Sequence, residues 1–368
     1  MLCKKISLKD FRNIESAEIS FSDGVNVLLG NNAQGKTNLL EAIYFFALGK
    51  SFRGAKDAEM IRFGCERAEI SMDFTEEGRT GLQNFEVRIE KNRRRQTEIN
   101  HVRAERRSDM IGKFRAVLFC PEHLSLIKDG PSLRRNYLDI AISMFRPVYL
   151  KSLQRYYAVL DQRNRLIKEA KENRNLLDDT IDIWNEQLAE EAAFISDFRE
   201  KYVKTVGESV SECFSDMTGE KEKTEMIYLG SSKQENYSDR DETKKKYKEL
   251  LSSSLEREIY AGTTLYGIHK DDIDIKINEK SARLFGSQGQ QRSLALAMKL
   301  AEGEICLKET GDRPVLLLDD VLSELDKKRR EYLLGSIKER QVIITTCEDA
   351  DFGNSKKISV DGGRYEEI

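Results

Sequence analysis

Eight residues near the start of the sequence have the types and the spacing of a phosphate-binding loop. The segment Gly30-Asn31-Asn32-Ala33-Gln34-Gly35-Lys36-Thr37 fits the pattern G-x-x-x-x-G-K-[ST]. In such a loop, the backbone N–H groups and the positive end of the following helix dipole bind phosphate oxygens. Lys36 can reach the β- and γ-phosphates of a nucleoside triphosphate, and the Thr37 hydroxyl can ligate Mg²⁺. These residues predict a nucleotide and magnesium site.

The residues on either side of this loop predict the strand and the helix that it requires. Residues 24–29 form a short apolar run that is typical of a buried strand. Residues 38–46 contain neither proline nor glycine, and they predict a helix. A chance glycine turn is the alternative, and it would produce the pattern in about one chain in a hundred of this length. The order strand, loop, helix favours the nucleotide site.

A second group of candidate catalytic residues follows an apolar run late in the sequence. Residues 315–318 predict a strand, and they end in Asp319 and Asp320, which is a Walker B pattern. Asp319 can hold Mg²⁺ directly or through water, and Asp320 can orient or deprotonate an attacking water. The alternative is a buried strand followed by acidic residues that cap a helix. The earlier phosphate-binding loop favours the Walker B interpretation.

A second turn of small residues, at residues 285–292, opens a predicted helix over residues 293–307. The turn reads Phe285-Gly286-Ser287-Gln288-Gly289-Gln290-Gln291-Arg292, and it predicts a second anion site at a helix start. It has no nearby lysine, so it is not a second phosphate-binding loop. Two phosphate-binding ends with only one complete pocket predict a head-to-tail dimer. In that dimer, Ser287 of one chain would touch the γ-phosphate held by Lys36 of the other.

Composition limits the classes of protein to which the chain can belong. The 368 residues suffice for one large domain or two, and the formal net charge of −3 means that any DNA-binding surface must be local. No signal peptide is visible, and the longest apolar run, residues 39–48, is too short to span a bilayer. The six cysteines contain no C-x-x-C pair, which indicates free thiols in a reducing compartment. We expect a cytoplasmic protein with no membrane partner.

One local surface with a strong charge is the segment of residues 91–115. It holds nine Lys and Arg against three acids, a formal charge of +6. A solvated hairpin and a patch that contacts DNA phosphates both explain such a segment. The candidate DNA-contacting residues are Arg93, Arg94, Arg95, Arg103, Arg106 and Arg107.

The remaining patterns predict the elements that position these residues. Alternating apolar residues over 66–99, and again near the N-terminus, predict an antiparallel sheet. The span 148–313 contains no proline, and it predicts helices over residues 149–171 and 178–217 with a turn between them. The fold class is therefore α/β: a mixed sheet core, an antiparallel sheet, and an inserted helical lobe with a short helical hairpin.

The order of these motifs resembles the ATP-binding-cassette heads of the SMC-like group, and more narrowly the bacterial RecF family. The residues that carry the resemblance are 8–13, 30–44, 49–53, 121–139, 267–272, 287–292 and 316–334. Among these heads, residues 121–139 are specific to RecF. The resemblance implies an ABC-type ATPase head in residues 1–122 and 260–368, with the helical lobe in residues 123–259.

The resemblance also implies a function and partners. RecF-like proteins bind ATP with Mg²⁺, dimerise on it, and bind duplex DNA near single-strand gaps. They act with RecO and RecR to load RecA, and slow ATP hydrolysis resets them. By position, Glu122 resembles the residue at the cassette Q-loop near Mg²⁺, and Arg12 resembles an N-terminal arginine that touches nucleotide. Ser287, Gly289, Gln290 and Asp326 would complete the pocket of a partner chain.

Two residues depart from the common cassette pattern. Asp320 replaces the usual glutamate, and Thr346 stands where many cassettes have a switch histidine. Both departures favour weak turnover and a switch over a pump.

Three other classes of protein fit the sequence less well. An SMC-type tether needs hundreds of heptad residues and a hinge, which this chain lacks. A transporter ATPase places its signature closer to the phosphate-binding loop and needs a membrane partner. A metabolic kinase with a phosphate-binding loop would lack residues 287–291.

Overall fold

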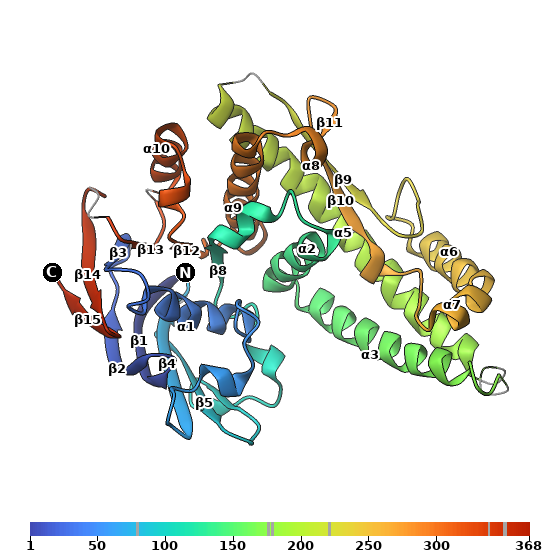
Figure 1. The fold of residues 1–368 in the computed structure, drawn as a ribbon, viewed down its shortest axis with the longest axis horizontal. Coiled ribbons are helices and arrows are strands. Elements are labelled where there is room, and N and C mark those ends of the chain that lie inside the picture. The colour runs from blue at the N-terminus through green and yellow to red at the C-terminus, as the bar shows by residue number, and fades with distance from the viewer. Residues whose placement is uncertain (79–80, 175–176, 178–179, 220–221, 338, 349–351) are drawn as a thin grey trace. The chain divides into compact units, whose positions relative to one another are not determined.

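The computed structural model describes residues 1–368 except 79–80, 175–176, 178–179, 220–221, 338 and 349–351. The described chain divides into two units, each of which is treated by itself. The first unit comprises Met1–Ser125, Asp216–Gly219 and Arg292–Ile368, and the second comprises Leu126–Ser215 and Glu220–Gln291. The α/β fold class predicted from the sequence is confirmed (Figure 1).

A mixed six-stranded sheet forms one layer of the first unit. Its order is β15-β14-β3-β13-β12-β8, and only β15 runs antiparallel to its neighbour. The strands are β3 (Val25–Leu29), β8 (Ala116–Phe119), β12 (Val315–Asp319), β13 (Val342–Thr346), β14 (Ser355–Asp361) and β15 (Arg364–Glu367). Strands β12 and β13 and the edge strand β8 are buried along their length, which explains their continuous apolar runs.

An antiparallel sheet forms the other layer, in the order β2-β1-β4-β5-β6-β7. The strands are β1 (Leu2–Phe11), β2 (Ile14–Ser20), β4 (Arg67–Thr75), β5 (Gln83–Glu90), β6 (Gln96–Ile99) and β7 (Val102–Arg103). Every second residue of β4 is buried, so one face of the sheet meets the core and the other meets solvent.

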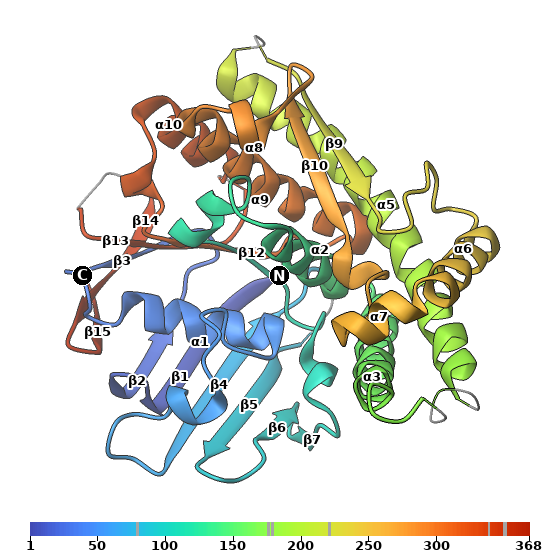
Figure 2. The ribbon, with the colours of Figure 1, turned by 45° about the vertical axis from the view of Figure 1, so that its right-hand side comes forward.

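Helix α1 (Lys36–Leu48) lies between these two sheets, as Figure 2 shows. Ten of its thirteen residues are buried, because the helix has a sheet on either side. One buried cluster joins Leu40 and Phe46 of the helix to Phe85 of β5 and Leu317 of β12. The same unit contains α10 (Lys327–Ser336) and most of α9 (Gln288–Thr310). Short 3₁₀ turns lie at η1 (Asp57–Met60), η2 (Arg107–Met110), η3 (Pro121–Ser125) and η5 (Leu322–Glu324).

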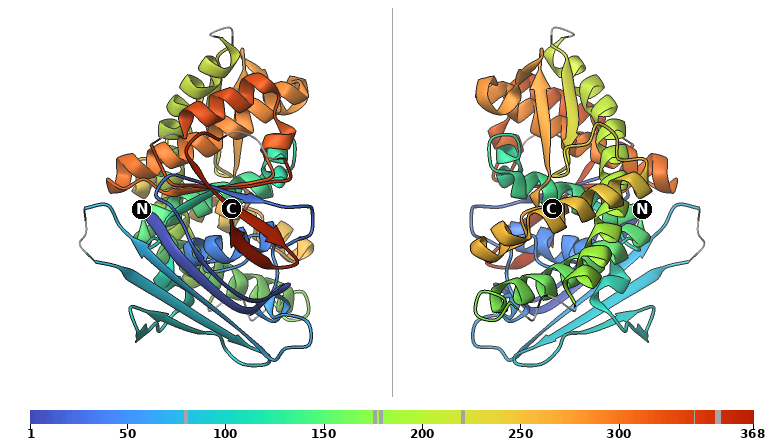
Figure 3. Two further views of the ribbon diagram at one scale, coloured as in Figure 1. Left: turned by 90° about the vertical axis from the view of Figure 1, so that its left-hand side faces the viewer. Right: turned by 90° about the vertical axis from the view of Figure 1, so that its right-hand side faces the viewer.

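Helices dominate the second unit. They are α2 (Pro131–Phe145), α3 (Pro147–Glu169), α5 (Ile181–Thr218, of which the last residues belong to the first unit), α6 (Arg240–Ser253), α7 (Leu255–Ala261) and α8 (Ala282–Phe285). The predicted pair of long helices corresponds to α3 and α5. Helix α6 lies along α5 (Figure 3), where Arg240 pairs with the buried Asp197.

The second unit also contains a small sheet that changes the predicted domain boundary. The sheet has the order β11-β10-β9, with β9 (Thr224–Leu229), β10 (Asp272–Ile277) and β11 (Lys280–Ser281); η4 (Ile268–Lys270) precedes β10. Residues 260–291 were predicted to belong to the ATPase head, but they fall in the second unit. The cause is pairing, since β10 joins β9 and Asp272 accepts two hydrogen bonds from Arg134 of α2.

No helix in the described part of the chain is long and apolar enough to cross a membrane.

Candidate functional site: the phosphate-binding loop and its surroundings

The predicted loop connects β3 to α1, in the setting expected from the sequence. Gly30 has no room for a side chain, because a Cβ there would lie 2.2 Å from the carbonyl oxygen of Val360. Gly35 adopts a φ of +119°, which side-chain-bearing residues rarely adopt. Both glycines of the pattern are therefore required by local geometry.

Lys36 is buried, and its ammonium group folds back over the loop. Its Nζ donates to the carbonyl oxygens of Gly30 and Asn31 and lies 3.3 Å from the sulfur of Cys347. The charge is thus held beside the loop backbone, where a polyphosphate would compete for it. This placement agrees with the role predicted for the lysine.

Side-chain oxygen atoms from helix α1 and from strands β12 and β13 meet next to the loop. The hydroxyls of Thr37 and Thr345 both donate to Asp319 Oδ1, at 2.9 and 2.8 Å. Thr345 Oγ1 in turn accepts the backbone N–H of Asp320 at 2.9 Å. Burial raises the pKa of Asp319, and the charges of Glu122 and Asp320 raise it further.

This arrangement fits the predicted Mg²⁺. Hydroxyl and carboxylate oxygens are the ligands that Mg²⁺ prefers, and a cation would relieve a buried carboxylate crowded by two others. Within the described ranges, no cluster of three or more His, Cys, Asp or Glu side chains could hold a metal by itself. Mg²⁺ usually takes one or two carboxylates and completes its shell with phosphates and water.

A cavity of about 360 Å³ opens over the loop and gathers most of these residues. It is lined by Asn13, Asn32, Ala33, Gln34, Gly35, Lys36, Thr37, Asn38, Arg53, Asp320 and Thr345. Sequence reasoning did not assign Asn13, Asn38 and Arg53 to the site. They form a chain of hydrogen bonds at its wall, from Arg53 to Asn38 at 2.9 Å and from Asn38 to Asn13 at 2.8 Å. Arg53 lies in residues 49–53, which carry part of the family resemblance. That position was the one sign in the sequence that Arg53 could belong to the site.

The small-residue turn that contains Ser287, Gly289 and Gln290 lies in the second unit, at the start of α9. The backbone N–H of Ser287 donates to Gln290 Oε1 at 2.7 Å, and the N–H of Gln290 donates to Ser287 Oγ at 3.2 Å. This reciprocal pair is a capping box, which fixes the first turn of the helix. Gly289 lies within that turn. The structure therefore places Ser287 at the start of a helix, while the anion site there and its contact with a partner's nucleotide stay predictions.

Comparison with known proteins settles the family. The family model described as RecF/RecN/SMC N terminal domain matches residues 2–360. The chain belongs to this family.

Proteins and solved structures of the RecF branch match over nearly the whole chain. The DNA replication and repair protein RecF of Ruminiclostridium cellulolyticum is 42% identical over 355 residues, covering 96% of this chain and 95% of that protein. The protein of the same name from Acetivibrio thermocellus is 38% identical and covers 99% of both chains. A solved structure described as the recombination mediator protein RecF-ATPrS in the RecFOR pathway has a TM-score of 0.95 at 35% identity, covering 100% of this chain and 98% of that one. The RecF resemblance is thus confirmed.

More distant heads share the fold alone. The Smc head domain of Pyrococcus furiosus, solved with an extended coiled coil and bound to part of ScpA, is 20% identical, with a TM-score of 0.58 and coverage of 100% and 95% of the two chains. The ABC-type ATPase head predicted from the sequence is confirmed as a fold.

Two residues assigned through the RecF resemblance, Glu122 and Arg12, lie near the cavity. Glu122 is exposed in η3, close enough that its charge contributes to the raised pKa of Asp319. Arg12 binds the buried Glu41 of α1 through two hydrogen bonds of 2.8 and 2.6 Å and also donates to the carbonyl of Glu59. Its contact with nucleotide remains a prediction, because its guanidinium holds α1 and does not line the cavity.

Asp326, which was predicted to reach a partner's nucleotide, caps α10 in the first unit. Its carboxylate accepts the backbone N–H of Arg329 at 3.0 Å and pairs with the side chain of the same arginine. The carboxylate remains half exposed.

The basic segment needs one correction. Arg95 is 6% exposed, and its guanidinium donates to the carbonyl of Gly49, faces Asp57 and lies over the Phe45 ring at 4.7 Å. It holds the edge of the antiparallel sheet against α1, so it is not available to DNA. The remaining five arginines of the predicted set, Arg93, Arg94, Arg103, Arg106 and Arg107, are exposed.

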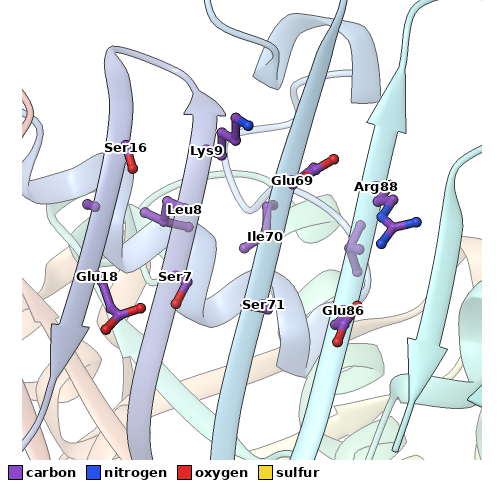
Figure 4. Close-up of a pocket in the computed structure, with 12 residues that line it drawn as sticks. Ser7, Leu8, Lys9, Ser16, Glu18, Glu69, Ile70, Ser71, Glu86 and Arg88 are labelled. Carbon is purple, nitrogen blue, oxygen red and sulfur yellow. The ribbon is translucent and has the colours of Figure 1, made fainter. Parts of the chain in front are cut away.

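A second hollow lies on the solvent face of the antiparallel sheet (Figure 4). It also measures about 360 Å³, and it spans strands β2, β1, β4 and β5. Its polar lining consists of Ser7, Lys9, Ser16, Glu18, Glu69, Ser71, Glu86 and Arg88. None of the residues predicted for nucleotide or DNA lies there.

Proposed function

We propose that this chain is an ATP-dependent DNA-binding protein of recombinational gap repair. The observation that carries the proposal is the cavity in which Lys36, Thr37 and Asp320 converge over a glycine loop. The names of the RecF relatives, which describe DNA replication and repair, support the DNA part. The solved RecF structure whose description names ATP supports the choice of nucleotide.

The residues of the cavity suggest how ATP would be held and slowly hydrolysed. The loop N–H groups and Lys36 would bind the phosphates, and Thr37 and Asp319 would hold Mg²⁺, which would supply positive charge against the phosphates. Asp320 orients a water molecule and accepts its proton as the water oxygen attacks the γ-phosphorus. The bond to the β–γ bridging oxygen breaks, leaving ADP and phosphate. We place Glu122 beside this reaction as a carboxylate near the metal.

ATP would also bring two chains together. In the proposed homodimer, Ser287, Gly289, Gln290 and Asp326 of one chain complete the pocket that contains Lys36 of the other. Light scattering after gel filtration tests this with wild type, Lys36→Arg and Ser287→Arg. We expect ATP to double the mass of the wild type only. Nucleotide-dependent dimers of either variant would contradict the shared pocket.

The exposed arginines of residues 91–115 are the proposed contacts to duplex DNA. Because phosphate contacts release counterions, charge reversal of Arg93 and Arg94 should weaken binding and flatten its salt dependence. Arg88→Glu is the matched control, since Arg88 is exposed on β5 outside this segment. If the double variant and the control bind duplex DNA with equal affinity, the segment is a solvated surface and not a DNA contact.

The preferred substrate and partners complete the proposal. We infer that the ATP-bound dimer clamps duplex DNA near single-strand gaps in the cytoplasm and helps RecO- and RecR-type partners to load a RecA-type recombinase. Measuring affinity for duplex, single-stranded and gapped DNA, with and without ATP, tests it. Tightest ATP-dependent binding to gapped duplex is expected. A preference for bridging two intact duplexes would favour an SMC-type tether, the alternative suggested by the shared head fold.

A further inference from the structure

The last hairpin of the chain covers the outer side of the phosphate-binding loop. Strands β14 and β15 are joined by Gly362 and Gly363, and β14 pairs in parallel with β3, the strand that leads into the loop (Figure 1). No motif in the sequence connects this hairpin with nucleotide.

Three hydrogen bonds tie the hairpin to the two residues that precede Lys36. The N–H of Gly362 donates to Gln34 Oε1 at 2.6 Å, and the N–H of Gly363 donates to the Gln34 carbonyl at 2.8 Å. The hydroxyl of Tyr365 donates to the Gly35 carbonyl at 2.9 Å. Burial raises the pKa of Tyr365, so the hydroxyl keeps the proton that it donates.

The turn between β1 and β2 adds a fourth bond from the same side. Asn13 Nδ2 donates to the Gln34 carbonyl at 3.2 Å. The Gln34 carbonyl is thus held toward the two hairpins. The Gly35 carbonyl accepts from Tyr365 and also from the N–H of Leu39, in the first turn of α1.

Peptide geometry links these carbonyls to the phosphate-binding groups. In a planar trans peptide, the C=O of one residue and the N–H of the next point in opposite directions. The bonds to the Gln34 carbonyl therefore turn the N–H of Gly35 away from the hairpin. The bond from Tyr365 acts together with the first turn of α1 to fix the direction of the Lys36 N–H. These N–H groups come at the start of α1, where backbone donors have no partner within the helix.

The hairpin and the loop also fit too closely to move independently. A Cβ on Gly363 would lie 2.8 Å from the carbonyl oxygen of Asn13, and a Cβ on Gly35 would lie 3.1 Å from the Tyr365 hydroxyl. Val360 of β14 leaves no space for a side chain at Gly30. A shift of the hairpin must therefore shift the loop.

We propose that the β14–β15 hairpin is the element that orients the phosphate-binding N–H groups, with Tyr365 as a positioning residue. The proposal rests on the proposed function, in which this loop binds ATP. It makes a specific statement about the ligand: the hairpin acts on the polyphosphate and not on the base.

Calorimetry with two ligands tests the proposal. Tyr365→Phe keeps the ring and removes only the hydroxyl, and we expect the Kd to rise about three- to tenfold. The factor should be the same for ATP and for inorganic tripolyphosphate, which has no base. Tyr260→Phe is the control, because Tyr260 is 89% exposed in the second unit. A loss of thermal stability with an unchanged Kd would reduce Tyr365 to a structural role and overturn the proposal.

A second variant and a measurement on the wild type test the proposal even if Tyr365→Phe fails to fold. Gly363→Ala places a methyl group against Asn13 at a φ of +84°, and it should weaken both ligands as well. In the wild type, tripolyphosphate should slow hydrogen exchange at Gly362 and Gly363, since coupling between two sites is reciprocal. Unchanged exchange there would contradict the proposal without any mutation.

Lys36→Ala separates the two levels of inference. If the wild type and Lys36→Ala bind ATP equally, the proposed nucleotide site fails. If Lys36→Ala loses binding while Tyr365→Phe and Gly363→Ala bind as the wild type does, only the hairpin inference fails.

Discussion

The first unit contains two polar hollows of the same volume, about 360 Å³ each, and they differ in what they offer a ligand. The hollow over the phosphate-binding loop is bordered by backbone at a helix start and by one buried lysine. The hollow on the antiparallel sheet is bordered by side chains that alternate along regular strands (Figure 4).

The difference lies first in the backbone. Ser7 pairs with Glu18 on one side and with Ser71 on the other, and Ser71 pairs in turn with Glu86. Backbone donors of these strands are taken up by ladder hydrogen bonds, so few remain for a ligand. At the loop, the chain leaves regular structure, and the first N–H groups of α1 have no acceptor within the helix.

The difference lies also in charge. On the sheet, Lys9 and Arg88 stand in one row with Glu69 between them, so positive and negative groups alternate. At the loop, Lys36 donates to the carbonyls of Gly30 and Asn31, while Asp319 accepts from the hydroxyls of Thr37 and Thr345, so the cation and this carboxylate have different partners. Two hollows of equal volume thus differ in their backbone and in the partners of their charged groups, and on that difference we predict anion binding at the loop only.

Removing the loop lysine should produce the largest contrast between the hollows. Lys36→Ala loses hydrogen bonds to a charged phosphate, which we expect to raise the Kd for ATP roughly 30- to 150-fold. Lys9→Ala, in the sheet hollow, should leave that Kd within about twofold. Isothermal titration calorimetry of both variants measures the effect. Similar losses of ATP affinity would show that the two hollows do not differ in nucleotide binding.

Asp319→Asn should have the next largest effect. It should lower the rate of ATP hydrolysis and raise the thermal stability of the protein. Loss of a negative metal ligand should reduce Mg²⁺-dependent ATP hydrolysis about 10- to 100-fold. Steady-state phosphate release across a Mg²⁺ titration measures this. Turnover equal to that of the wild type would exclude Asp319 as a ligand.

Without nucleotide and metal, the difference in stability between Asp319→Asn and the wild type should depend on pH. The folded-state pKa of Asp319 is raised, so its charged form costs stability above that pKa. Asp319→Asn should therefore melt at a higher temperature than the wild type at neutral pH. The gap should close as the pH falls through the folded-state pKa, and a gap independent of pH would contradict the assignment.

Arg53 at the cavity wall should contribute less, because its side chain is 46% exposed and is screened by solvent. Arg53→Ala should raise the Kd for ATP about threefold, and added salt should shrink the difference. Fluorescence titration at two ionic strengths provides the measurement. A loss as large as that of Lys36→Ala would show that the wall, and not the loop, dominates binding.

The smallest effect is expected in the sheet hollow itself. Ser71→Ala removes a polar group that faces solvent beside Glu86, and it should change the free energy of unfolding by about 0.5 kcal/mol or less. ATP affinity should not change. Urea denaturation and calorimetry check both statements, and weaker ATP binding would reveal a connection between the two hollows.

Much of the nucleotide half could be predicted because its signals are local. The loop pattern, the apolar run before it and the acidic pair at the end of β12 each occupy a few consecutive residues. The burial of Arg95 was missed because net charge does not say which face of a strand a residue occupies. Arg95 and Thr97 are two residues apart and both buried, so the alternation of the strand was the unused signal.

The rest could not be predicted because it depends on contacts distant in sequence. Residues 260–291 moved to the second unit through pairing of β10 with β9, and neither strand carries a pattern that names its partner. The bond from Tyr365 to Gly35 joins residues 330 positions apart. Local patterns contain no information on such contacts.

The position of β3 in its sheet has a consequence for the order in which the protein can be assembled during synthesis. Both strands that flank β3 come from the end of the chain, since Val27 pairs with Ile344 on one side and with Lys357 on the other. A ribosome that has made the first 300 residues has therefore produced the loop without the strands that hold it. The sheet around the loop can therefore form only after β13 and β14 have been synthesised, although the loop itself is made early.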